Sequence, residues 1–511
     1  MLPRVTTRAA IVFALLSAGL YWLAFPPADA GPLAFVALVP LLLAIRGRSV
    51  GQAFLLGWLS GSVAIHALVS SSIFAAASRF MPDHRWVPWL LALIIPQIYG
   101  ALYFGVFAAI ATRLASRQLG VRFELLAMAA AWTACEFARS RLGDGCPWVL
   151  LAHSQHATLW LIQIADLTGT YGVSFVIVLI NAVVASLLPL TARAWRWRLK
   201  ELVVAGALLL SVWAYGEYQL GRWRSPATAG VRVSLIQGNV PEEWRSSLRR
   251  LPDSLRRLGE LTTEASRAQP DLVVWPENAV TVSVADNGQL LAGAAAALPP
   301  KARLLIGAPR AERRDDGSAS LRNSAYLLDE SGRVVSVYDK MRLTPYGESL
   351  PEIARIFAGR PNAEGEYVAG DRPTQFEVVG RRFATIICYE AIYAELVRDL
   401  VLGGAEFVVN ISNDGWFGSQ PSLEQHFYAA LFRAVENRRY LLRATNAGIT
   451  AVIDPHGTVT MRAPRNQATL LTSEVTPFGA LTFYTRYGDV FAWLCVVGVL
   501  VALWSPARQR A

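Results

Sequence analysis

Long apolar stretches separated by short arginine-bearing loops fill most of the first 224 residues, and one more lies near the C-terminus. Eight stretches fit this description, near residues 9–26, 32–46, 52–75, 87–112, 123–138, 165–190, 200–220 and 486–504. About 20 apolar residues suffice for a helix to cross a bilayer. The chain is 53% apolar and only 17% charged, which excludes an ordinary soluble protein over its whole length. We therefore expect eight membrane helices.

Residues between about 225 and 484 follow a different pattern. Short runs rich in β-branched residues end in turn signals, and helical stretches such as 253–268 and 423–438 fall between them. This alternation predicts a layered α/β domain. We predict three parts: a seven-helix membrane bundle over 1–224, the α/β domain over 225–484, and the eighth helix with a short tail over 485–511.

The distribution of basic residues predicts the orientation in the membrane, because short cytoplasmic loops are enriched in Lys and Arg. One alternating set of loops and ends is rich in them: Arg4, Arg8, Arg46, Arg48, Arg113, Arg117, Arg122, Arg193, Arg196, Arg198, Lys200, Arg508 and Arg510. The other short loops hold fewer, namely Arg79, Arg85, Arg139 and Arg141. Both termini are therefore expected in the cytoplasm and the α/β domain on the far side.

Two other interpretations of the basic residues are disfavoured. Arg4 and Arg8 precede an apolar run, and Ala28-Asp29-Ala30 resembles a signal-peptide cleavage site. The chain becomes apolar again at once, however, and the charge alternation requires this segment. The net charge of +10 does not predict nucleic-acid binding, because the basic residues flank apolar blocks and form no single basic face.

Three predicted strands of the α/β domain end on reactive side chains. Glu277 closes DLVVWPE, Lys340 closes VVSVYDK and Cys388 closes FATIICYE. A thiol becomes a good nucleophile once a carboxylate takes its proton, and an ammonium group favours the thiolate and a developing oxyanion. These residue types suffice for nucleophilic catalysis by a thiol, although their spacing does not show that they meet.

The sequence predicts neither a disulfide framework nor a metal site. Of the cysteines Cys135, Cys146, Cys388 and Cys495, two fall within apolar blocks, and no CxxC pair occurs. His66, His153 and His156 lack clustered ligand partners. Cys388 is expected to remain a free thiol.

The motifs WPEN, DKMRLTPYGE and CYE, in this order, resemble those of the nitrilase superfamily, whose αββα sandwich carries a Glu, Lys and Cys triad. The whole chain, with eight spans around the domain, resembles the bacterial apolipoprotein N-acyltransferase family. Further segments carry the likeness: EFARSRL, PWVLLAHSQ, GTYGVSF, QGNVPEEW, NISNDGWFG and TNAGITAVIDPHG. The resemblance implies an αββα sandwich inserted between helices 7 and 8 of an eight-helix bundle.

The resemblance also implies a reaction in two steps. The sn-1 acyl chain of a phospholipid, with phosphatidylethanolamine as the expected donor, passes to Cys388. It then passes to the α-amino group of the N-terminal diacylglyceryl-cysteine of an apolipoprotein. No metal or organic cofactor is implied. The enzyme is expected to be a monomer in the inner membrane of a Gram-negative type of bacterium, with its catalytic domain in the periplasm.

Residue roles follow from the same resemblance. Glu277 is implied as the general base and acid, and Lys340, with the backbone N–H of Tyr389, as the oxyanion stabiliser. Other positions match family residues that support the site or handle substrate: Glu348, Tyr389, Glu390, Trp244 and Trp416.

A thioester that faced open water would be hydrolysed, so the site must admit lipid and exclude water. The segment SLPEIARIF is a candidate lid, because its apolar residues recur at roughly helical spacing. These residues are Leu350, Ile353, Ile356 and Phe357.

Two alternatives remain open at this stage. A membrane-tethered amidase or nitrilase would pass the acyl group to water. A transporter or receptor would use the outer domain only to bind a ligand, and would not need Cys388.

Overall fold

The computed structural model describes residues 5–80, 86–117, 121–188, 192–222, 230–241, 244, 248–284, 289–313, 319–345, 347–349, 367–417 and 420–505. The chain forms two compact units. The first comprises Met1–Trp223, Gly418–Tyr428 and Tyr487–Ala511, and the second comprises Arg224–Phe417 and Ala429–Arg486. Within the described residues, the first unit is helical and the second contains the strands.

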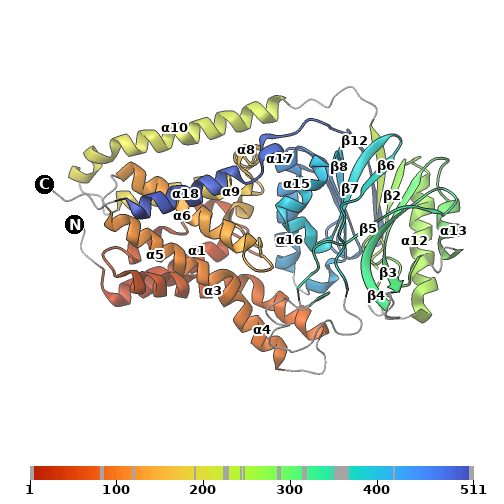
Figure 1. Cartoon of the computed structure of the whole chain (residues 1–511), viewed down its shortest axis with the longest axis horizontal. Coiled ribbons are helices and arrows are strands. Elements are labelled where there is room, and N and C mark those ends of the chain that lie inside the picture. Colours follow the sequence, from red (N-terminus) through yellow and green to blue (C-terminus); the bar gives the residue numbers. More distant parts are fainter. Residues whose placement is uncertain are drawn as a thin grey trace. The chain divides into compact units, whose positions relative to one another are not determined.

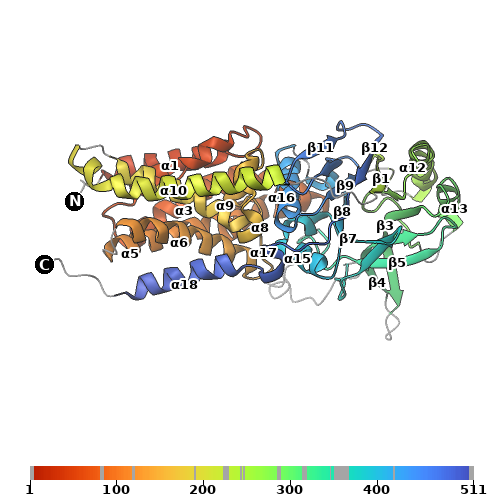
Figure 2. The same ribbon diagram turned by 90° about the horizontal axis from the view of Figure 1, so that it is seen from above.

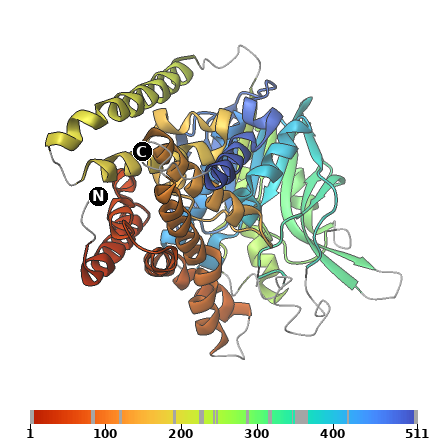
Figure 3. The same cartoon turned by 60° about the vertical axis from the view of Figure 1, so that its left-hand side comes forward.

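Two six-stranded sheets form the centre of the second unit (Figure 1). Their orders are β12-β1-β2-β3-β4-β5 and β11-β10-β9-β8-β7-β6. The strands are β1 (Val231–Gln237), β2 (Leu272–Val274), β3 (Arg303–Arg313), β4 (Ala319–Leu328), β5 (Val334–Asp339), β6 (Gln375–Val378), β7 (Arg381–Ile387), β8 (Phe407–Ser412), β9 (Leu441–Thr445), β10 (Ala451–Ile453), β11 (Val459–Arg462) and β12 (Thr469–Val475). Figure 3 shows the long antiparallel hairpin of β3 and β4 in green.

The strand directions bring the candidate catalytic residues to strand ends. Strands β1, β2 and β3 run parallel, as do β7, β8 and β9. Parallel strands end at the same edge of a sheet, where binding and catalytic groups commonly gather. Glu277 follows β2, and Cys388 follows β7 directly.

Side chains alternate between two cores. The core between the sheets includes Leu272 and Val274 from the first sheet and Ile387 and Ile411 from the second. The intervening Val273 belongs to a separate core on the outer face of the first sheet. This period of two is the pattern that a strand buried on both faces requires.

Helices cover the outer faces of both sheets. The outer core of the first sheet includes residues of α12 (Leu251–Ser266) and α13 (Gln289–Ala296). Helix α15 (Ala394–Leu402) contacts β7, and α16 (Gln420–Asn437), which belongs to this unit from Ala429 onward, lies beside the second sheet (Figure 2). The predicted αββα sandwich is confirmed. Short helical turns complete the unit: η4 (Leu248–Arg250), η5 (Cys388–Ile392) and η6 (Asp414–Phe417).

The sandwich begins and ends on neighbouring strands. Strand β1 pairs antiparallel with β12, and Val231, the first residue of β1, pairs with Val475, the last residue of β12. The polypeptide therefore enters and leaves the two sheets at one step of a single β ladder.

Apolar helices form the first unit. They are α1 (Thr7–Leu23), η1 (Gly31–Phe35), α2 (Val39–Ala44), α3 (Val50–Phe80), α4 (Val87–Pro96), η2 (Gln97–Ala101), α5 (Leu102–Ser116), α6 (Val121–Arg141), η3 (Leu151–Gln155), α7 (Leu159–Ile162), α8 (Ala165–Thr168), α9 (Thr170–Leu187), α10 (Ala192–Arg222) and α18 (Val490–Trp504), which α17 (Phe483–Tyr487) precedes. Among the described residues, three helical segments are long and apolar enough to cross a membrane: Val50–Ser78, Val87–Ser116 and Thr170–Leu187.

Small residues allow α3 and α5 to approach closely. A Cβ atom on Gly57 would lie 2.4 Å from the Phe104 carbonyl oxygen, and one on Gly61 would lie 2.8 Å from the Phe104 Cβ. Glycines four residues apart present a flat surface to a neighbouring helix, a common arrangement in membranes. The two glycines therefore determine how near these helices lie.

The last helix of the chain packs against helices formed much earlier in the sequence. Helix α18 contacts α6 and α9, and Ala492 shares a core with Phe137, Leu150 and Tyr171. An ion pair joins Arg141 at the end of α6 to Asp489, the residue before α18. The outer face of α18 is apolar and exposed, with Leu494 63% accessible. This face suits a lipid environment.

One predicted span differs from the structure. Most predicted apolar stretches coincide with helices, but residues 32–46 contain the 3-10 turn η1 and then the six-residue helix α2. Pro32 and Pro40 lie in the first turns of these elements, and proline lacks the N–H that a helix interior needs. A six-residue helix is only about 9 Å long, so this stretch is not one continuous spanning helix.

Helix α16 is shared between the two units. Its segment up to Tyr428 belongs to the first unit, where the Tyr428 hydroxyl donates to Asp29 Oδ2 (2.9 Å). In the same unit the Trp148 indole N–H donates to Gln425 Oε1 (2.8 Å). The loops of the helical unit that contain Asp29 and Trp148 therefore hold the first part of α16 by specific hydrogen bonds.

Candidate active site

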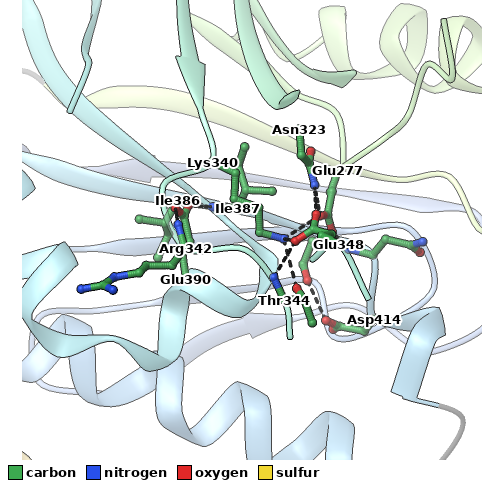
Figure 4. A network of polar contacts seen from close by, with 12 residues as sticks. Glu277, Asn323, Lys340, Arg342, Thr344, Glu348, Ile386, Ile387, Glu390 and Asp414 are labelled. Atoms are coloured by element: carbon green, nitrogen blue, oxygen red, sulfur yellow. Dashed lines mark hydrogen bonds and ion pairs between the residues drawn. The ribbon is translucent and has the colours of Figure 1, made fainter. Parts of the chain in front are cut away.

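Glu277 is a buried carboxylate that accepts hydrogen bonds on both oxygens. It is 2% exposed. Its Oε1 accepts from Asn323 Nδ2 (2.7 Å) and Lys340 Nζ (3.3 Å), and its Oε2 accepts from the backbone N–H of Asn413 (2.7 Å) (Figure 4). These donors fix the orientation of the carboxylate.

The backbone of Glu277 is also held closely. Gly307 lies on the neighbouring strand β3, and a Cβ atom there would come within 2.6 Å of the Glu277 Cα. Real Cβ atoms do not approach backbone this closely, since interiors are packed at van der Waals contact. A glycine at position 307 is therefore what allows the loop after β2 to lie against β3.

Lys340 is a buried cation between two carboxylates. It is 1% exposed, and its Nζ lies 2.7 Å from Glu348 Oε2 and 3.3 Å from Glu277 Oε1. Burial alone would lower the pKa of Lys340, but the Glu348 and Glu277 carboxylates outweigh it and leave the pKa above its usual value. Lys340 is therefore an ammonium ion at neutral pH, suited to stabilise negative charge and not to act as a base.

Glu348 and Asn323 complete the surroundings of this cation. Burial opposes ionisation of Glu348, but Lys340 lowers the pKa of Glu348 below its usual value. Asn323 Nδ2 donates to both Glu277 and Glu348, at 2.7 and 2.6 Å. Glu348 Oε2 also accepts from the backbone N–H of Thr344 (2.8 Å). One amide thus ties the two carboxylates together on either side of Lys340.

Cys388 lies at a sharp turn after strand β7. Its backbone φ is +51°, a left-handed conformation that costs a non-glycine residue roughly 1–3 kcal/mol and is common at active sites. The residue is 5% exposed. Burial, and then the Glu277 charge, raise the pKa of the Cys388 thiol, while Lys340 opposes that rise. The resting sulfur is therefore a protonated thiol that needs a base.

Glu390 braces the turn that carries Cys388 against the segment that follows Lys340. Its Oε2 accepts from the backbone N–H of Ile387 (2.7 Å). Its Oε1 accepts from the backbone N–H groups of Met341 (2.7 Å) and Arg342 (3.1 Å) and from the Tyr338 hydroxyl (2.8 Å). Glu390 therefore links a strand of the first sheet to the turn that carries Cys388 on the second.

Replacing Glu390 by glutamine is expected to slow acyl-enzyme formation roughly tenfold to a hundredfold, since an unpaired buried donor costs about 1–3 kcal/mol. Every partner of Glu390 is a donor, so an amide NH₂ must face at least one of them. The rate of acyl-enzyme accumulation measures this effect. Glu395→Gln, which alters a partly exposed carboxylate 3.8 Å from Arg342, is the matched control. Equal rates in the two variants would contradict the bracing role.

The same substitution has a pH signature. Burial raises the pKa of Glu390 from 4.5 to about 7, against the hydrogen bonds that lower it. The folded protein therefore binds this proton more tightly than the unfolded chain does. The part of the free energy of unfolding that comes from this proton is fully present below pH 4.5 and is lost as the pH rises through about 7. Thermal unfolding of Glu390→Gln should lack this part of the pH dependence. An unchanged profile would mean that Glu390 is ionised throughout.

The structure brings together five of the residues singled out in the sequence: Glu277, Lys340, Glu348, Cys388 and Glu390. Tyr389 follows Cys388, and its ring meets Tyr393 edge to face, with centroids 5.6 Å apart. The candidate lid residues Leu350, Ile353, Ile356 and Phe357 lie outside the described residues.

The two candidate tryptophans lie in different surroundings. Two guanidinium groups lie over the ring of Trp244. The ring centroid is 5.7 Å from Arg250 Cζ and 5.0 Å from Arg257 Cζ. Trp416 belongs to η6, directly after the strand end that supplies the Asn413 N–H. None of the contacts that the structure records for Trp244 involves the triad.

Sequence reasoning missed several residues that touch the triad or its partners. Asn323 lies within β4, and Asn413 uses only its backbone N–H, so neither has a distinctive side-chain pattern of its own. The motif NISNDGWFG supplied a signal, but only Trp416 was selected from it. Among the described residues, no group of three or more His, Cys, Asp and Glu side chains could hold a metal ion.

Known protein families and individual relatives match this sequence over nearly its whole length. The carbon-nitrogen hydrolase family model matches residues 232–478, and the model of the apolipoprotein N-acyltransferase N-terminal domain matches residues 17–183. An apolipoprotein N-acyltransferase of Geobacter metallireducens is 35% identical, covering 99% of this chain and 96% of the relative. That of Azotobacter vinelandii is 33% identical, covering 98% and 95%.

Several structures of one amidase are similar to about half of the chain. An amidase from Nesterenkonia sp. is 18% to 20% identical in its several structures, and one of them covers 53% of this chain and 94% of the amidase with a TM-score of 0.36.

Proposed function

Because the chain belongs to the apolipoprotein N-acyltransferase family, we propose that it moves the sn-1 acyl chain of a phospholipid to the α-amino group of the N-terminal S-diacylglyceryl-cysteine of apolipoproteins. Phosphatidylethanolamine is the proposed donor. The observation that carries the proposal is the buried group of Glu277, Lys340 and Cys388, in which a base, a cation and a nucleophile interact at strand ends.

In the first step Cys388 Sγ attacks the ester carbonyl carbon while Glu277 takes the thiol proton. A carbon–sulfur bond forms, and negative charge develops on the carbonyl oxygen. When the tetrahedral intermediate collapses, the ester carbon–oxygen bond breaks and Glu277 returns the proton to the leaving alcohol. The products are a thioester on Cys388 and a lysophospholipid.

In the second step the amine of the lipoprotein attacks the thioester carbon. Glu277 accepts a proton from the amine, an amide bond forms, and the carbon–sulfur bond breaks. The proton on Glu277 then returns to the Cys388 sulfur, so the enzyme regains its starting state. One carboxylate therefore serves both half-reactions without a cofactor.

Lys340 would stabilise the oxyanion in both steps, together with the backbone N–H of Tyr389. Two N–H groups of the Lys340 ammonium face the Glu277 and Glu348 carboxylates. The contact of Lys340 Nζ with Thr344 Oγ1 is longer, at 3.4 Å. The donor directed at Thr344 is the one most easily turned toward a substrate oxygen, because that hydrogen bond is the weakest of the three. Lys340 thus keeps both carboxylate contacts while it binds the oxyanion.

The helical unit would hold the enzyme in the inner membrane as a multi-pass monomer. We propose eight membrane segments, the second made of η1 and α2 and not of one helix, with both termini cytoplasmic and the sandwich periplasmic between the seventh and eighth. The alternation of basic loops favours this orientation. The packing of α18 against α6 and α9 places the end of the chain in the same bundle as its beginning.

Trp244, Trp416 and Tyr389 would handle substrate beside the triad, as their family motifs suggest. The stretch with Leu350, Ile353, Ile356 and Phe357 would act as the lid that excludes water from the thioester.

The purified enzyme tests this function directly. Incubation with phosphatidylethanolamine labelled in its sn-1 chain should give an acyl-protein that hydroxylamine cleaves, and mass spectrometry should place the acyl group on Cys388. Adding a diacylated lipopeptide should discharge the label onto the peptide amine. The alternative function, a membrane-tethered amidase, predicts release of free fatty acid instead. Release of free fatty acid with no acylated peptide would contradict the transferase proposal.

A further inference from the structure

Ser412 lies beside the nucleophile. Strands β7 and β8 are parallel and Ile387 pairs with Ile411, so the residues that follow, Cys388 and Ser412, are neighbours at the same sheet edge. Ser412 is fully buried. Burial raises the pKa of the Cys388 thiol, and a side-chain hydrogen bond with Ser412 opposes that rise.

The Ser412 hydroxyl also belongs to a buried charged network. Ser412 Oγ donates to Asp414 Oδ1 (2.7 Å), and Arg443 Nη2 donates to both oxygens of Asp414 (2.7 and 2.9 Å). Neither Asp414 nor Arg443 is exposed. A Cβ atom on Gly448 would lie 2.0 Å from Asp414 Oδ2, so the carboxylate fills the space that this glycine leaves.

The network continues across three strands. Arg443 Nη1 hydrogen-bonds to Asn410 Oδ1, and Asn410 Nδ2 donates to the carbonyl oxygen of Ile386 (3.1 Å). Arg443 lies on β9, Asn410 on β8 and Ile386 on β7. The position of the Ser412 hydroxyl relative to Cys388 is therefore fixed by contacts that include the strand leading to the nucleophile.

A hydroxyl suits a sulfur that changes its protonation state. A thiol is a donor, whereas a thiolate is only an acceptor, and a hydroxyl group can accept in the first state and donate in the second by rotating about its C–O bond. A backbone N–H could serve only the thiolate. Ser412 has a single hydroxyl hydrogen, so it can donate to Asp414 or to Cys388, but not to both at once.

We propose that Ser412 is a further catalytic residue, whose hydroxyl hydrogen turns from Asp414 to the Cys388 sulfur as the thiol passes its proton to Glu277. The S–H bond breaks and the proton goes to a Glu277 oxygen, while the Ser412 O–H bond stays intact. Asp414 keeps both hydrogen bonds from Arg443, so no buried charge is left unpaired. Once the sulfur is acylated, the hydroxyl returns to Asp414.

The Ser412 hydroxyl would stabilise the thiolate in addition to Lys340. Lys340 is shared between two carboxylates, whereas Ser412 approaches from the second sheet and needs no other partner when it turns. A buried thiolate in a site with little water gains from each added donor. The inference rests on Cys388 being the nucleophile of the proposed function.

The test is the rate at which iodoacetamide alkylates Cys388, located by peptide mass spectrometry across neutral and mildly alkaline pH. Ser412→Ala removes the hydroxyl and should lower this rate roughly tenfold or more at each pH, because a hydrogen bond to a charged group contributes about 1.5–3 kcal/mol. Ser412→Thr keeps the hydroxyl and should restore most of the rate.

Ser234→Ala is the matched control. It removes another buried serine hydroxyl, one that hydrogen-bonds to Thr472 Oγ1 at 2.7 Å on the first sheet, and should alkylate like the unaltered protein. Circular dichroism and thermal unfolding establish that each variant is folded. A folded Ser412→Ala variant that alkylates as fast as the Ser234→Ala control would overturn the inference.

Alkylation needs neither lipid nor lipopeptide, so it separates this inference from the proposed function. If phospholipid fails to acylate Cys388 while Ser412→Ala still slows alkylation, the substrate assignment falls and the role of Ser412 stands. If acyl transfer proceeds but alkylation is unchanged by Ser412→Ala, the role of Ser412 falls alone.

Discussion

Cys388→Ser is expected to abolish the acyl-enzyme and to lower acyl transfer at least roughly a thousandfold. A serine hydroxyl is far less acidic than a thiol, so the Glu277 carboxylate cannot generate an effective nucleophile from it in the same geometry. Because oxygen replaces sulfur with little change in shape, the turn after β7 and its left-handed backbone should persist. Mass spectrometry of the intact protein after exposure to phospholipid measures the loss.

Cys146→Ser is the control for this substitution, since it changes another free cysteine that contacts no triad residue in the structure. It should load an acyl chain at the normal rate. An acyl group that still accumulates on the Cys388→Ser protein as a hydroxylamine-labile adduct would show that a different residue is the nucleophile. Loss of transfer in both variants would instead point to a general effect of cysteine replacement.

Glu277→Gln should lower the rate of acyl-enzyme formation roughly a hundredfold to ten-thousandfold, the usual range for removing a general base. The amide cannot accept the thiol proton. Moreover, both carboxylate oxygens of Glu277 accept from donors, namely Asn323, Lys340 and the Asn413 N–H. Either orientation of the amide sets an NH₂ group against a donor, so the site also loses hydrogen bonds.

Single-turnover loading with labelled phospholipid measures this effect, and Glu277→Asp separates its two causes. The aspartate retains a base but shortens the side chain, so it should recover part of the rate lost in Glu277→Gln. Glu330→Gln, which changes a surface carboxylate paired with Arg303, is expected to load normally. A Glu277→Gln protein that loads at the rate of Glu330→Gln would require the base to be elsewhere.

The candidate triad was predictable because each of its residues follows a strand whose sequence pattern is clear. The pattern identifies which side chain closes which strand, and parallel strands bring their ends to one edge. Lys340 follows β5 in one sheet, however, while Cys388 follows β7 in the other. Their meeting depends on how the two sheets stack, which the periodicity of single strands does not specify.

The supporting residues were less predictable, because their roles arise from pairing between strands. Ser324 pairs with Asp339, and this register sets Asn323 beside Lys340, which donates its backbone N–H to the Asn323 carbonyl (2.8 Å). Arg443 reaches Asp414 from a neighbouring strand. No local pattern marks such residues, since a buried arginine resembles any other arginine in a sequence.

The sequence likewise predicted some features of the helical unit and missed others. Composition located the apolar stretches, since a helix in lipid must be apolar along much of its length. Composition did not show that prolines interrupt the stretch at 32–46, because apolar residues on either side of them conceal the break. Nor did it show that residues 418–428 join the helical unit.

The pairing of Val231 with Val475 bears on how a protein with this organisation can arise. A folded module whose two ends lie opposite each other on neighbouring strands can be inserted into a loop of another protein without forcing that loop apart. The entropy of closing the host chain then depends little on how many residues the module contains. Inserting an entire hydrolase-like module therefore adds little more loop-closure entropy to the host than a long turn would. The helix that follows the module can still pack against helices that precede it, as α18 does against α6 and α9.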